Sequence, residues 1–160
     1  YDPAALTYEG GKRLRLPALF LPIIERREIV ALARVFVDRD GNKHPLLEDA
    51  KRTLGDPRGG AVRIGQLDGD HLNLAEGFEE AESVIALFGL PGCWSVNGAE
   101  LYARVHIPDH IRSITIYSQH GAAAAKGVAK ARSHLGARGR TIAVELPPPC
   151  GDWNDAWLAA

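Results

Sequence analysis

The chain has 160 residues, a hydrophobic fraction of 46 % and a formal net charge of −1 at pH 7. These values fit one globular domain, or one domain with a small appendage, and argue against a protein coated in nucleic acid. No apolar run approaches the ~20 residues that a membrane helix needs, so we expect no membrane span. The two cysteines, Cys93 and Cys150, are too few for a disulfide framework, which favours a cytoplasmic protein. Because methionine is absent, we expect a piece of a longer protein.

The first part of the chain favours a small strand-rich unit. Residues 1–16 are polar and turn-rich and look like a linker or an arm. Residues 19–24 and 29–37 are extended runs around a charged break, which is the pattern of an antiparallel hairpin. Residues 45–60 look irregular, and residues 61–64 predict one more short strand.

From His71 onward, strand patterns alternate with helix patterns. We predict strands over 72–75, 93–96, 112–118 and 140–146, and helices over 78–88, near 99–105, near 122–135 and near 153–159. Such alternation indicates an α/β fold, with a Rossmann-like core of about four parallel strands and helices on both faces. We place this core in residues 67–160 and a small antiparallel lead-in in residues 1–66.

Glu76 stands at the end of the predicted strand 72–75, in the turn that opens the helix 78–88. In open α/β sheets, ligands bind at this carboxyl edge. Gly77 lets the backbone turn sharply and approach a ligand closely. The same pattern also fits an exposed acid in an ordinary turn.

Other polar groups follow later strands, and charge is unevenly distributed. The polar groups are Ser118, Gln119, His120, Asp152 and Asp155. Seven acids and no Lys or Arg lie between Arg63 and Arg104, whereas six bases and no acid lie between Asp109 and Glu145. Carboxylates at strand ends suit Mg²⁺, and the basic segment suits phosphate. Solvated helix faces of opposite sign explain the charges equally well.

Several common site motifs are absent. The sequence has no GxxxxGK[ST] loop, no GxGxxG after a strand and no GxSxG elbow. His106 and His110 have the spacing of zinc ligands, but Pro108 breaks the helix that would align them. We expect Cys93 to be a core residue of its strand and Cys150 to lie in a loop.

The motifs that remain resemble those of a Toprim domain, the metal-dependent module of primases, topoisomerases and some nucleases. The resemblance rests on Ala75-Glu76-Gly77 followed by Phe78-Glu79-Glu80-Ala81, and on Pro147-Pro148-Pro149-Cys150-Gly151-Asp152-Trp153-Asn154-Asp155. In the lead-in, it also rests on Asp40-Gly41, Lys51-Arg52, Leu54-Gly55 and Gly59-Gly60-Ala61-Val62-Arg63. More narrowly, the chain resembles the Toprim region of phage- and plasmid-type primases and primase-helicases.

This resemblance implies a function in DNA replication, in a primase of a mobile element. Glu76 would be the acid/base of nucleotidyl or phosphodiester chemistry, with Mg²⁺ or Mn²⁺ as cofactor. Single-stranded DNA and nucleotides would be the partners and short RNA primers the product, with zinc-ribbon and helicase parts elsewhere in the protein. A Toprim nuclease is an alternative that the lead-in and the closing motif make less favourable.

The second family motif departs from the pattern. The resemblance expects Asp-x-Asp after the strand 112–118, but this chain has Gln119 and Gly121, and a family glycine is Ala124. We therefore expect weak metal binding by Glu76, helped by Glu79 or Asp152. Two functions stay open: a metal-impaired primase fragment, or an inactive Toprim domain that binds nucleic acid or docks a protein.

The remaining candidate residues each have two interpretations. Glu79 matches a family carboxylate, but an acid also suits the first turn of a helix. Asp152 and Asp155 are either metal ligands or caps of the last helix, beside the motif residue Asn154. Four bases are either phosphate contacts or solvated charges: Lys51, Arg52, Lys126 and Lys130, with Arg132 near the last two.

Overall fold

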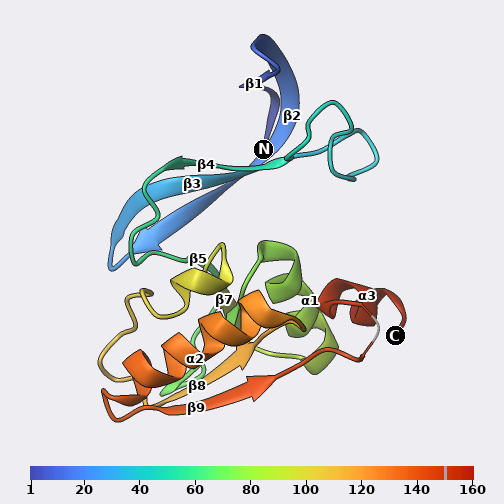
Figure 1. Ribbon diagram of the computed structural model, residues 1–160. Coiled ribbons are helices and arrows are strands. Elements are labelled where there is room, and N and C mark those ends of the chain that lie inside the picture. The colour runs from blue at the N-terminus through green and yellow to red at the C-terminus, as the bar shows by residue number, and fades with distance from the viewer. Residues whose placement is uncertain (150) are drawn as a thin grey trace.

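The computed structural model describes residues 1–149 and 151–160, so the predicted loop position of Cys150 lies outside the described residues. The chain forms two sheets, a four-stranded antiparallel sheet and a five-stranded mixed sheet, which are the upper and lower parts of Figure 1. None of the described helices is long and apolar enough to cross a membrane.

The antiparallel sheet has the order β1-β2-β3-β4. Its strands are β1 (Asp2–Glu9), β2 (Lys12–Glu25), β3 (Glu28–Phe36) and β4 (Lys51–Gly55). The predicted hairpin is present, with Glu25 paired to Glu28 across the turn. This sheet confirms the antiparallel lead-in.

Two predictions for the lead-in were wrong. Residues 1–16 are not a linker, because they form β1 and the start of β2, joined by Gly10 and Gly11 at φ +54° and +77°. Two glycines with positive φ are the signature of a tight hairpin turn. Within residues 45–60, the segment 51–55 is strand β4 rather than irregular chain, and it pairs with β3.

The mixed sheet has the order β5-β7-β6-β8-β9. Its strands are β5 (Val62–Gly65), β6 (His71–Ala75), β7 (Gly92–Ser95), β8 (Ser113–Tyr117) and β9 (Thr141–Glu145). The last four are parallel, as predicted, and β5 runs antiparallel to β7. Since β5 precedes residue 66 but pairs within the core sheet, the division into residues 1–66 and 67–160 stays a prediction.

Helices cover both faces of the core sheet, as predicted. They are α1 (Phe78–Phe88), α2 (Ala122–Gly136), α3 (Trp153–Leu158) and a 3₁₀ turn, η1 (Ala99–Leu101). Leu72 and Leu74 of β6 belong to the apolar cluster of α2, whereas Ala75 belongs to that of α1 and α3. This alternation follows from the two-residue period of a strand. Cys93 is fully buried in the α1 layer, which confirms it as a core residue.

The helix predicted near 99–105 is much shorter in the structure. Only η1 is helical, and a turn follows it.

Two contacts join the antiparallel sheet to the core sheet: an apolar cluster in which Ile23 meets Val62, and an isolated bridge between Ile24 and Ala61. The antiparallel sheet is therefore packed against the core rather than tethered to it.

Candidate functional site

Glu76 lies where the sequence predicted it, in the turn between β6 and α1. Its backbone carbonyl accepts hydrogen bonds from the N–H groups of Asn97 and Gly98, with N···O distances of 2.8 and 3.3 Å. The hydroxyl of Ser95 donates to the same carbonyl at 3.3 Å. These bonds tie the turn after β6 to the turn after β7, so the backbone under Glu76 is held from two sides.

Burial raises the pKa of the Glu76 carboxyl, and the nearby carboxylates of Glu80 and Glu100 raise it further. A hydrogen bond from the Ala99 backbone and the charge of Lys51 oppose this shift. A carboxyl whose pKa is raised by burial and by neighbouring acids is a common feature of acid/base sites. Among the acids of this site, Glu76 is thus the best candidate for acid/base chemistry.

Glu80 is a site residue that the sequence analysis missed. Its side chain lies in the first turn of α1 and only 8 % of the residue is exposed. The amide nitrogen of Gln119 donates to Glu80 Oε1 at 2.6 Å. Glu80 Oε2 is buried without a hydrogen-bond partner, and a Cβ at Gly77 would lie 2.0 Å from it. Glu80 follows another acid, Glu79, so the sequence carried no signal that singled it out.

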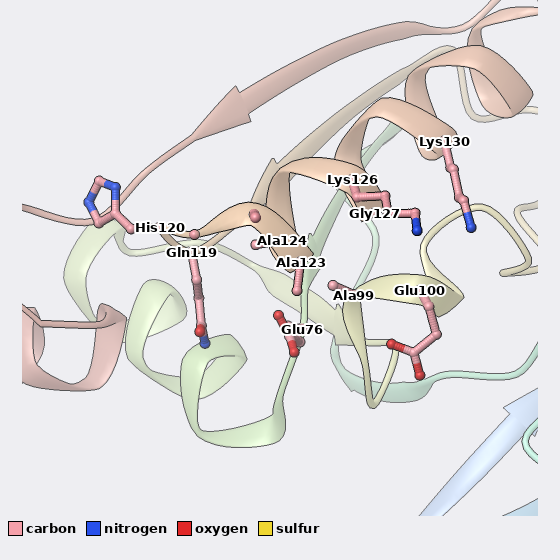
Figure 2. Close-up of a pocket in the computed structure, with 12 residues that line it drawn as sticks. Glu76, Ala99, Glu100, Gln119, His120, Ala123, Ala124, Lys126, Gly127 and Lys130 are labelled. Carbon is pink, nitrogen blue, oxygen red and sulfur yellow. The ribbon is translucent and has the colours of Figure 1, made fainter.

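A pocket of about 420 Å³ opens between Glu76 and the first turns of α2. Figure 2 shows Glu76 facing α2, while Lys126 and Lys130 extend from this helix on the side of Glu100. His120 also lines the pocket, but its ring turns away from Glu76 and its Nε2 is 3.0 Å from the carbonyl oxygen of Pro147. The pocket therefore combines acids at its base with two lysines along one wall.

Gly127 allows α2 to lie directly on η1. A Cβ at this position would be 2.4 Å from the carbonyl oxygen of Ala99 and 3.0 Å from its Cβ. Since Ala99 also donates its N–H toward Glu76, this close contact helps to set the wall opposite the acid.

Lys51 reaches the same region from the antiparallel sheet. Its Nζ lies 2.7 Å from Glu79 Oε2, and the two side chains are 39 % and 33 % exposed. A second hollow, of about 270 Å³, is lined by Lys51 together with Asp49, Glu76 and Glu80. Glu79 therefore pairs with a lysine, and Lys51 stands beside the acid of the site.

Arg52 has a different position from its neighbour Lys51. Its guanidinium donates to Glu9, to the hydroxyl of Thr7 and to the carbonyl oxygens of Tyr8 and Asp49. The bond to Arg52 is the main cause that lowers the pKa of Glu9. These side-chain contacts link β4 to β1, so the geometry favours a structural function for Arg52 over the predicted phosphate contact.

The closing motif caps α3. Asp152 Oδ1 accepts from the Asp155 N–H at 2.9 Å, and Asp155 Oδ2 accepts from the Asp152 N–H at 3.1 Å. The indole of Trp153 donates to the carbonyl of Ser118 at 2.9 Å, and Asn154 lies near Ser83 of α1. Both aspartates thus form a capping box, and the structure does not bring them together with Glu76 as the predicted metal ligands.

Comparison with known families finds two matches along the chain. One family model, described as a domain of unknown function, matches residues 1–64, and a second, described as the Toprim domain, matches residues 71–160. The chain belongs to the Toprim domain family. Toprim domains generally bind divalent metal ions. Among curated proteins, none has a sequence that matches this Toprim chain.

Solved primase structures have a similar fold. A DNA primase domain from Pseudomonas aeruginosa is 17 % identical with a TM-score of 0.55, covering 99 % of this chain and 53 % of that one. The zinc-binding and RNA polymerase domains of the Aquifex aeolicus primase are 15 % identical with a TM-score of 0.56, and the match covers 94 % of this chain and 40 % of that one. The RNA polymerase domain of Mycobacterium tuberculosis primase DnaG is 13 % identical with a TM-score of 0.56, and the match covers 96 % of this chain and 57 % of that one. The Toprim chain thus spans about half the length of these structures, and its fold is primase-like.

Proposed function

We propose that this Toprim domain belongs to a primase-like protein of a mobile element, where it binds single-stranded DNA and nucleotides while metal-dependent nucleotidyl transfer is impaired. The family match and the primase-like fold support the first part. Zinc-binding and helicase functions would lie in other parts of the protein, and a cytoplasmic setting fits a replication function.

The observation that carries the proposal is the side chain of Gln119. It occupies the position at which the resemblance expects a metal-binding aspartate, and its amide donates to Glu80 instead. No three His, Cys, Asp or Glu side chains converge on a possible metal position within residues 1–149 and 151–160. Mg²⁺ prefers several oxygen ligands, and here one oxygen of Glu80 is bonded to an amide and the other is buried. The residues present do not fit a resident divalent ion.

Gly121 adds a second obstacle to a metal site. It has φ +112° and ψ 162°, a backbone conformation that is essentially limited to glycine. An aspartate at 121 would therefore need the loop before α2 to change shape. Loss of the motif thus involves the backbone as well as two side chains.

The basic wall of the pocket supports binding. Lys126 and Lys130 lie on the exposed side of α2, and neither forms an ion pair with a described acid. Free lysines beside a pocket suit the phosphates of a nucleic acid strand, and such binding weakens with salt. Lys51, although paired with Glu79, is placed at the adjoining hollow and extends this surface.

One observation favours the alternative, an active primase-type enzyme that uses Mg²⁺ or Mn²⁺. Burial and the neighbouring Glu80 raise the pKa of Glu76, and a raised carboxyl pKa is a common property of acid/base catalysts. In that case, nucleotide phosphates would have to complete the metal coordination that the protein lacks.

Calorimetric titration with Mn²⁺ and Mg²⁺ separates the two functions. We expect no saturable binding by the wild type or by Glu76→Gln, and no primer synthesis by the longer protein. Sub-millimolar binding that Glu76→Gln abolishes would favour the enzyme and contradict the proposal.

Binding of fluorescent single-stranded DNA in EDTA tests the second part. We expect salt-dependent binding that weakens about tenfold in the double variant Lys126→Ala/Lys130→Ala, as two lost phosphate contacts would give. Arg138→Ala removes one charge from an exposed position just beyond α2 and is the control. Absence of DNA binding by the wild type would refute this part.

A further inference from the structure

The carboxyl edge of the sheet presents an electrostatic problem that the family usually solves with a cation. Glu80 is buried and lies close enough to Glu76 to raise its pKa. A buried carboxylate is costly unless it is hydrogen-bonded or paired with a cation. Within the described chain, no Lys, Arg or His forms an ion pair with Glu76 or Glu80.

Gln119 provides the one side-chain hydrogen bond that Glu80 receives in the described residues. The amide nitrogen must face the carboxylate, because the amide oxygen would repel it. The distance between Gln119 Nε2 and Glu80 Oε1 is 2.6 Å, so the two side chains are in direct contact. An aspartate or glutamate at 119 would place a third acid beside Glu76 and Glu80 and would require a cation.

The bond joins two parts of the site that are distant in sequence. Glu80 belongs to the first turn of α1, after β6, and Gln119 lies in the loop between β8 and α2. The strands β6 and β8 are neighbours, with Ala75 paired to Tyr117. The amide thus links the segments that follow two neighbouring strands, β6 and β8.

We infer that the Gln119 amide replaces the divalent cation as the link between α1 and the β8–α2 loop, so that the folded site is independent of metal. Gln119 then has a structural function of its own, the hydrogen bond to Glu80, and is more than the loss of a metal ligand. The inference concerns how the site is held together. It therefore stands or falls separately from DNA binding, which has its own assay.

Thermal unfolding of four chains at pH 7.5 tests this inference: wild type, Gln119→Glu, Glu80→Gln/Gln119→Glu and the control Gln66→Glu. Gln119→Glu keeps the shape of the side chain but replaces the donor with a third acid. The double variant exchanges the amide and the carboxylate, so it restores the pair in reverse. Gln66 is the other glutamine of the chain and is exposed.

We expect the wild-type Tm to be the same in EDTA and in millimolar Mn²⁺. Gln119→Glu should lower the Tm by roughly 5 °C in EDTA, and Mn²⁺ should recover most of the loss. The exchanged pair should regain most of the Tm without metal, and Gln66→Glu should change little. If Gln119→Glu does not fold, the exchanged pair still decides the question. A saturable rise in the wild-type Tm with Mn²⁺, or no recovery in the exchanged pair, would overturn the inference.

Discussion

Gly127→Ala is the substitution whose effect follows most directly from the packing of the site. The new methyl group would meet the carbonyl oxygen of Ala99 at 2.4 Å and its carbonyl carbon at 2.8 Å. Both are backbone atoms, so no side-chain rotation relieves the contact. The helix α2 or the turn η1 must move instead.

Two effects of opposite sign determine the size of the change. Alanine is favoured over glycine in a helix interior by about 1 kcal/mol. Overpacking typically costs about 1–3 kcal/mol, and a clash with rigid backbone belongs at the upper end. We expect a net loss of about 2 kcal/mol, which corresponds to a fall in Tm of roughly 4–8 °C for a chain of this size.

Gly136→Ala is the matched control, because Gly136 ends the same helix and a Cβ there meets nothing within 4 Å. It should leave stability unchanged or raise it by up to about 1 kcal/mol. Urea unfolding followed by tryptophan fluorescence measures both variants. If Gly127→Ala is as stable as Gly136→Ala, with an unchanged m-value, the close packing of α2 on η1 is refuted.

Three further predictions concern single contacts. The pKa of Glu76 in the native state is raised above its ordinary value of 4.5. Between these two pKa values the native state binds more protons than the unfolded state, so the free energy of unfolding falls as the pH rises through that range. Glu76→Gln should therefore unfold at higher urea than wild type at pH 7.5, by a margin that shrinks toward pH 4. A double-mutant cycle with Lys51→Ala and Glu79→Ala should give a coupling energy of about 0.5 kcal/mol, lower in high salt, because the pair is partly exposed. Trp153→Phe should cost about 1–3 kcal/mol in urea unfolding, since the carbonyl of Ser118 loses its buried donor.

Each of these has a clear contrary result. A Glu76→Gln gain that is equal at pH 4 and pH 7.5 would show that ionisation is not its cause. A zero coupling energy at low salt would mean that Lys51 and Glu79 do not form their ion pair in solution. A fully stable Trp153→Phe would indicate that the indole hydrogen bond to Ser118 contributes nothing to stability.

The core was predictable because its periodicity is strong and local. The helix predicted over 78–88 has the observed bounds, since one apolar stripe fills it from the first turn to the last. Strand β1 was missed because its buried positions, Ala5 and Thr7, are small and partly polar, while Leu6 and Tyr8 face solvent. Its pattern is therefore the reverse of an ordinary hydrophobic alternation.

The site was predictable in its position but not in its partners. The turn that holds Glu76 follows from the strand–helix pattern. The ion-pair partner of Glu79, however, is Lys51, which lies 28 residues earlier in the chain. Glu79 and Glu80 are adjacent acids that the sequence does not distinguish. Only the packing of α1 shows that one faces β4 and the other faces Gln119.

The position of β5 has a consequence for how this protein can be divided. This strand covers one edge of β7, and its chain arrives directly from the antiparallel sheet. A fragment that begins at residue 67 would leave the backbone groups of β7 unpaired along that edge, and exposed strand edges promote aggregation. We therefore expect the Toprim region to be obtained as a soluble monomer only when the preceding strand is kept. Expression trials and limited proteolysis should then both place the junction between β4 and β5, before Ala61.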